Sequence, residues 1–168
     1  MTAITSSTIF SNPYELVLSI LDTRSNVTDP KDNTGARKFV YTSDPFNKAF
    51  DFGEYPYLYV KFPVLDQTNH SANSKHHWMN YTMTLYARTI KDGSGNSRTD
   101  AGITDMKSIV DDILETFNKS SVKAQIRGAG MANLMIDLIS ADTIVSNQQD
   151  IFESEFEVDW NFRMQVST

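Results

Sequence analysis

The segment from Ile151 to Val166 alternates between apolar and polar side chains almost without interruption. One parity is broken only by Ser154, and its apolar members are Phe152, Phe156, Val158, Trp160, Phe162, Met164 and Val166. Side chains of a β-strand point alternately to opposite faces, so this pattern predicts one long, half-buried strand. At roughly 3.4 Å per residue the strand reaches about 50 Å, far beyond the usual five or six residues. Such a strand either bends across a small domain or projects from it to pair with another chain.

The length and charge of the chain limit what it can be. With 168 residues and no cysteine, it can bury a core without disulfides, and we expect one domain over 1–168. Its polar N-terminal arm, 1–11, is expected to be flexible and lacks the pattern of a signal peptide or membrane anchor. A formal net charge of −6 argues against binding of nucleic-acid phosphates as the main activity. We therefore expect a protein that is soluble in the cytoplasm when it is made.

Two segments have the signals of helices. Asn12 can cap the first, Pro13 suits its first turn, and an apolar stripe continues to about Asp22. The second is expected to begin at a Thr104 cap and to end near Asn118. Its apolar stripe consists of Met106, Ile109, Val110, Ile113, Leu114 and Phe117.

Strands and connections are expected between and after these helices. The expected strands are Phe39–Thr42, Tyr57–Phe62, Trp78–Ile90, Leu134–Ser140 and the C-terminal segment. The expected connections are Gln67–His77, Lys91–Gly102, a turn around Gly128 and Gly130, and a polar link over Asp142–Asp150. Ser25–Ala36 is predicted to be an exposed loop, or an arm that orders only against a partner. The order indicates an α+β fold: an antiparallel or mixed sheet packed by one or two helices, with a long C-terminal strand.

Four acidic residues share one face of the predicted C-terminal strand: Glu153, Glu155, Glu157 and Asp159. They form either an acidic surface or cation site, or simply the solvated face of a two-sided strand. We favour the solvated face, because neighbours about 6.8 Å apart need ligands from another segment to hold a metal ion.

No catalytic arrangement is apparent elsewhere. His70, His76 and His77 match no zinc-binding spacing, and no nucleophile motif or phosphate-binding glycine loop is present. We therefore expect no enzyme activity, no cofactor and no metal. The aromatic segment Tyr55–Tyr59 is either an exposed contact patch or the start of a core strand.

The order of these elements has a counterpart in a known family. A helix from about Asn12 precedes a strand that opens on Tyr55-Pro56-Tyr57-Leu58-Tyr59-Val60. A long strand at Met79–Ile90, an amphipathic helix at Thr104–Asn118 and closing strands at Leu134–Ser140 and Phe152–Val166 follow. This arrangement resembles the tail terminator (tail completion) proteins of long-tailed bacteriophages and related archaeal viruses. The resemblance covers most of the chain and rests on the order and length of elements rather than on an invariant motif. The polar segments Ser25–Ala36 and Gln67–His77 are longer than such a subunit needs.

The resemblance implies a structural virion protein. The family forms a ring, usually a hexamer, on the last ring of the tail tube, where it stops tube growth and joins the neck below the capsid. Implied partners are further copies of the chain, the tail tube protein and a neck or head-completion protein, with no membrane. DNA would pass through an acidic lumen without specific binding. The protein would assemble in the host cytoplasm and end in the virion tail. Candidate subunit contacts are Tyr55, Tyr57, Tyr59, Trp160 and Phe162.

Two alternatives remain at the level of the sequence. The chain could be another neck or baseplate component of the tail. It could instead be a small-ligand or carbohydrate-binding α+β domain with the Tyr55–Tyr59 aromatics in a pocket, which would be monomeric in solution.

Overall fold

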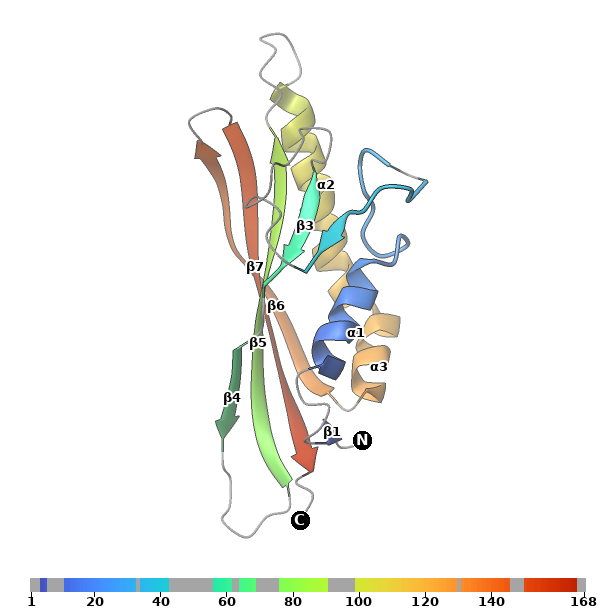
Figure 1. The fold of residues 1–168 in the computed structure, drawn as a ribbon, viewed down its shortest axis with the longest axis vertical. Helices are drawn as coiled ribbons and strands as arrows, with labels where there is room; N and C mark the ends of the chain where they lie inside the picture. The colour runs from blue at the N-terminus through green and yellow to red at the C-terminus, as the bar shows by residue number, and fades with distance from the viewer. Residues whose placement is uncertain are drawn as a thin grey trace.

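The computed structural model describes residues 4–5, 11–32, 34–42, 56–61, 64–68, 76–90, 99–129, 131–145 and 150–165. Over these residues the chain forms a seven-stranded mixed sheet and three helices. The helices are α1 (Ser11–Leu21), α2 (Thr99–Asn118) and α3 (Ser120–Gly128). Figure 1 shows an elongated molecule whose helices lie together on one side of the long strands. The predicted α+β class is confirmed.

Two long antiparallel strands form the middle of the sheet. β5 (His76–Ile90) pairs with β7 (Asp150–Gln165) along its whole length, from His76 opposite Gln165 to Ile90 opposite Ile151. The outer edge of β5 pairs with β4 (Val64–Thr68) at one end and with β3 (Tyr57–Val60) at the other. β2 (Val40–Tyr41) lies beyond β3 and runs parallel to it.

The outer edge of β7 is also shared. β6 (Met131–Val145) is antiparallel to it and β1 (Ile4–Thr5) is parallel to it near its end. The described sheet thus has β6 and β1 along one edge and β2 and β4 along the other, with β3, β5 and β7 between them.

The core lies between the sheet and the helices. On β5, Met83, Leu85 and Ala87 are fully buried, whereas the alternate residues are only half-buried, as the period of two predicts. The three buried β5 residues belong to one apolar cluster with the α2 residues Met106, Ile109, Ile113 and Phe117. The apolar stripe predicted for this helix is therefore confirmed.

Several predicted boundaries are wrong. α2 begins at Thr99 instead of Thr104, so the connection predicted over Lys91–Gly102 is shorter at its end. The extra turn has no apolar periodicity. Its Gly102 is buried, and the Gly102 carbonyl accepts a hydrogen bond from the Thr89 hydroxyl at 3.3 Å. This hydrogen bond attaches the start of α2 to β5.

Other segments predicted as connections also differ from the structure. Gly128 ends the helix α3, which the sequence interpretation missed, and α3 buries Val122 and Ile126. β6 runs through both the predicted short strand and the first part of the polar link. The ends of the predicted Gln67–His77 connection lie in β4 and β5. In each case pairing or packing with a distant element extends the regular structure beyond the local signal.

Candidate assembly surface

β6 is an edge strand with exposed apolar side chains. Among the described residues it pairs only with β7, and its register shifts twice, between Ala132 and Met135 and between Leu138 and Ser140. At the second shift Leu138 lies opposite Phe156 and Ser140 opposite Glu155, so Ile139 is an inserted residue. Met135, Leu138 and Ile139 are 62%, 40% and 52% exposed. An exposed apolar edge of this kind is a template for pairing with another chain.

These side chains surround the edge of the sheet instead of lying on one face. Met135 lies opposite Asp159, which shares a parity with the acidic row, whereas Leu138 lies opposite Phe156, a core residue. The register therefore places Met135 and Leu138 on opposite faces of the sheet. A surface that lies flat against one face cannot cover both, but a partner that continues the sheet can.

The face of the sheet opposite the core cluster carries tyrosines from neighbouring strands. Tyr59 of β3 stacks on Tyr86 of β5 with a centroid distance of 5.7 Å. The rings of Tyr41 in β2 and Tyr57 form a T-shaped pair with a centroid distance of 5.8 Å. The Lys38 ammonium lies 4.9 Å from the Tyr41 ring centroid. Aromatic cross-strand neighbours of this type tie short strands to a sheet, so these contacts hold β2 and β3 on β5.

An ion pair joins β5 to the acidic row. The Arg88 guanidinium donates to the Glu153 carboxylate, and it donates a second hydrogen bond to the Tyr57 hydroxyl at 3.2 Å. Both charged side chains are about 15% exposed, so the pair is largely removed from water. Burial lowers the pKa of Arg88, but the contacts with Tyr57 and Glu153 outweigh it, and the pKa is raised overall. Arg88 therefore stays charged at any working pH.

The rest of the acidic row is less open than a solvated face. Tyr86 donates to the Glu155 carboxylate at 3.3 Å. Burial, followed by the Glu155 charge, raises the pKa of this tyrosine. Glu157 is half-buried, and the side chain of Asp159 lies outside the description. Among the described residues no group of three or more His, Cys, Asp or Glu is arranged to hold a metal ion.

Of the residues predicted as subunit contacts, the described ones lie on two strands, β3 and β7, with β5 between them. Tyr57 is fully buried within the chain, which argues against a contact role, and Tyr59 is half-buried on Tyr86. Trp160 and Phe162 lie in β7 opposite Tyr81 and Met79, with side chains that are not described. Tyr55, like His70, lies outside the described residues. The structure instead directs attention to the edge strand β6, whose apolar run over 134–139 was the available sequence signal.

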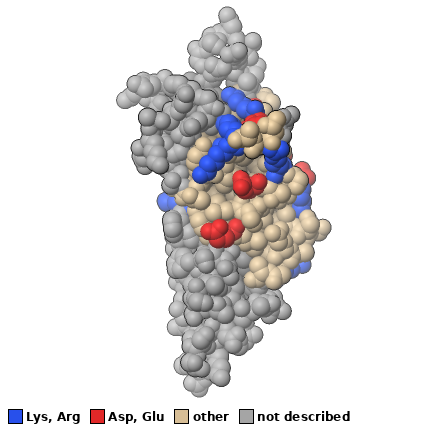
Figure 2. Space-filling view, turned by 45° about the vertical axis from the view of Figure 1, so that its right-hand side comes forward, with Lys and Arg blue, Asp and Glu red and all other residues tan. Residues whose placement is uncertain are grey.

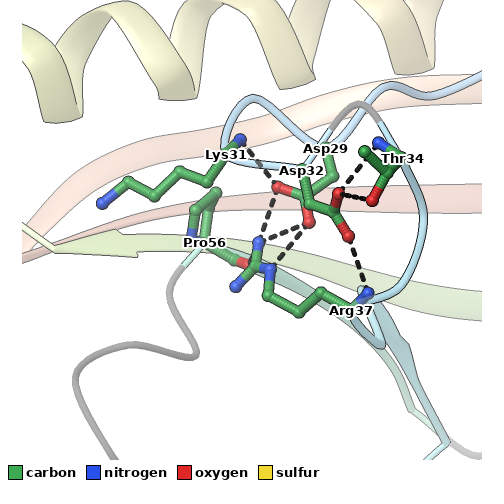
Figure 3. A network of polar contacts seen from close by, with 6 residues as sticks. All are labelled: Asp29, Lys31, Asp32, Thr34, Arg37 and Pro56. Carbon is green, nitrogen blue, oxygen red and sulfur yellow. Dashed lines mark hydrogen bonds and ion pairs between the residues drawn. The ribbon is translucent and has the colours of Figure 1, made fainter.

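The segment between α1 and β2, residues 22–39, holds a polar network that the sequence interpretation missed (Figure 3). Arg37 clamps the Asp29 carboxylate through its Nε at 2.8 Å and its Nη2 at 2.6 Å. It also donates to the Pro56 carbonyl at 2.8 Å. The Asp32 carboxylate accepts from the Thr34 amide at 2.8 Å, the Thr34 hydroxyl at 2.5 Å and the Arg37 amide at 2.7 Å. The Thr34 hydroxyl, followed by these amides, holds the Asp32 pKa well below its usual range.

The same segment is attached to the helix α2. The Thr116 hydroxyl donates to the Asn26 carbonyl at 2.6 Å, and the Thr28 amide donates to Asp112 at 2.9 Å. Val27 between them is buried. Of the two interpretations for Ser25–Ala36, an arm that requires a partner for order does not agree with these contacts. Aspartate, threonine and glycine at 29–35 are turn formers and were the signal for a structured loop.

Gly35 closes the loop. Its φ of +69° lies in the left-handed region, and a Cβ there would come within 1.7 Å of the Arg24 guanidinium. A pocket of about 290 Å³ lies beside it. The residues that line this pocket are Leu21, Asp22, Arg24, Val27, Thr28, Asp29, Asp32, Gly35, Arg37 and Phe39. Arg37 forms an ion pair with Asp29, and its amide donates to Asp32. The charged groups that line the pocket are therefore largely paired within the loop.

No helix over the described ranges is long and apolar enough to cross a membrane. No family model matches the sequence, and no curated protein matches it.

Proposed function

We propose that this chain is a structural subunit of a viral tail, a terminator that forms a ring on the end of the tail tube and joins it to the neck. The proposal rests on the resemblance in element order described above. The observation that carries it is the edge strand β6, which exposes Met135, Leu138 and Ile139 around an available sheet edge. Assembly subunits use exposed sheet edges for strand addition, and the apolar side chains would add buried area to such a contact.

The physical requirements of a terminator are compatible with this chain. A closed ring is a head-to-tail assembly whose rotation completes, so each subunit needs two different contact surfaces. In the described residues the two sides of the sheet end in different strands, β6 and β1 on one side and β2 and β4 on the other. The net charge of −6 suits a lumen through which DNA passes without binding. The tail tube protein and a neck protein would contact the two ends of the ring.

Deleting the gene provides the direct test. A ring that binds the last tube ring blocks the surface on which the next one would polymerise. Its loss should therefore leave capsids filled with DNA and unattached tail tubes of uncontrolled length in electron micrographs. Normal tails joined to heads would eliminate the proposal. Absence of all tubes would assign the chain to another tail component, such as a baseplate or tube initiator.

A further inference from the structure

Charge is distributed unequally between the two edges of the sheet. Residues 131–165, which contain β6 and β7, include seven acidic residues and one basic residue. Residues 24–41, which lead into β2, include four basic residues and two acidic ones in a chain of net charge −6. Figure 2 shows Lys and Arg side chains gathered at the level where Figure 1 places the loop before β2. Two acidic residues and no basic one therefore lie in β6, whereas the segment before β2 has a net positive charge.

The described side chains agree with this division. At the β6 edge, Asp137 is exposed and lies directly opposite Glu157 in the register. An exposed carboxylate on an edge strand can form an ion pair with an approaching cation. At the other edge, Lys31 and Lys38 are exposed on the segment before β2. The Arg37–Asp29 pair and the Asp32 network hold this segment in one conformation, so its cations are positioned before any partner arrives.

We propose that the β6 edge of one copy binds the β2 edge of a second copy, so that Asp137 meets the Lys38 region of its neighbour. Met135, Leu138 and Ile139 are covered in the same contact. This inference rests on the proposed function and names the two surfaces through which the ring closes. Because β6 contacts β2 and not a second β6, the contact is heterologous and generates a ring or filament instead of a closed dimer.

The experiment exchanges charges across the proposed contact. Asp137→Lys and Lys38→Glu are made separately and together, and mass photometry measures the concentration at which each protein assembles. In each single variant like charges meet at every contact, so assembly should require a concentration about tenfold higher or more. The double variant should recover assembly, and so should an equimolar mixture of the single variants, because alternating subunits then present opposite charges. Wild-type assembly should also weaken with added salt.

Matched controls carry the same charge changes away from both edges. Asp111→Lys and Lys107→Glu alter exposed positions on α2 and should leave assembly unchanged. Cooperative thermal melting of every variant verifies folding.

The possible outcomes separate the contact from the function. A β6 variant that fails to assemble beside a Lys38→Glu variant that assembles normally would overturn the heterologous contact in favour of β6 pairing with itself. If both single variants assemble at the same concentration as the wild type, the inference is overturned and the proposed function is unaffected. A wild-type chain that stays monomeric at every concentration and salt level would overturn the self-assembly on which both depend.

Discussion

β5 and β6 are strands of the same length, 15 residues, with opposite surroundings. β5 lies between β7 and the short strands β3 and β4, and its Met83, Leu85 and Ala87 are fully buried under the helices. β6 has one neighbour among the described strands, two register shifts, and three large apolar side chains in solvent. The difference teaches that strand length and apolar content do not decide whether a residue stabilises the fold. The number of neighbours does.

The two strands differ in pattern as well as in position. β5 alternates with a period of two from Met79 to Arg88, so one face is apolar and the register is well specified. β6 has a nearly continuous apolar run from Leu134 to Ile139, interrupted by Asp137. A continuous apolar run cannot lie on one face of a strand. Within this run Ile139 is inserted at a register shift and has no partner residue in β7. Ile139, the residue that breaks the alternation, is 52% exposed.

The largest effect should come from the helix that covers β5. Ile113 is fully buried in the cluster that includes Leu85. Replacing it by Asp buries an unpaired charge, which costs several kcal/mol, so Ile113→Asp should abolish cooperative unfolding. Circular dichroism during heating measures this, with Lys107→Asp on the exposed side of the same helix as the control. A soluble Ile113→Asp protein that melts cooperatively would mean that α2 does not pack on β5 in this way.

The same substitution in both strands tests the comparison directly. Leu85→Ala removes a side chain that is fully buried and should lower the free energy of unfolding by about 2–5 kcal/mol. Leu138→Ala removes one that is 40% exposed at the edge and should lower it by about 1 kcal/mol or less. Urea unfolding of both variants gives the two values. Equal losses would show that β6 is buried as deeply as β5 in the solution state.

The ion pair between β5 and β7 should have an intermediate effect. Arg88→Met leaves the largely buried Glu153 carboxylate without its cation and should cost about 2–4 kcal/mol. The double variant Arg88→Met/Glu153→Gln should recover part of that loss, because the unpaired charge is removed. Additive losses in the double-mutant cycle would contradict a direct interaction between the two side chains.

The smallest global effect should come from the loop before β2. Asp32→Asn weakens the acceptor for the Thr34 and Arg37 amides, so these two amides should exchange hydrogen faster while global stability changes little. Because the folded-state pKa of Asp32 is depressed, its contribution is present above the unfolded value of about 3.9 and is lost as the pH falls through the folded value. Protection of the two amides in the wild type should therefore persist at pH 4 and decline only in stronger acid. Unchanged hydrogen exchange of these amides in the variant would show that Asp32 does not stabilise the loop.

Local periodicity predicted the fold class and the central elements, but not the candidate surface. Leu85 and Ala87 on β5, and Ile109 and Ile113 on α2, repeat at the spacing of their own secondary structure, so their buried faces were visible in the sequence. The contact residues were not predicted in this way. Tyr57 appeared as a possible contact, and its burial follows from Arg88 and Tyr41, which are distant in sequence. An aromatic residue on a short strand carries no local signal of what will cover it.

The sequence by itself determined an α+β chain with long alternating strands, an amphipathic helix over the sheet, and no recognisable catalytic motif. These properties depend on the period of two or of about 3.6 residues, which any short window contains. Only the tertiary structure decided that β6 lies at the edge, that the Thr89 hydroxyl binds the start of α2, and that the segment before β2 is held by α2. Each of these depends on residues far apart in the chain meeting in space. Whether a strand lies at the edge of the sheet, and which residue pairs with a charged side chain, therefore depend on the fold and not on the local sequence pattern.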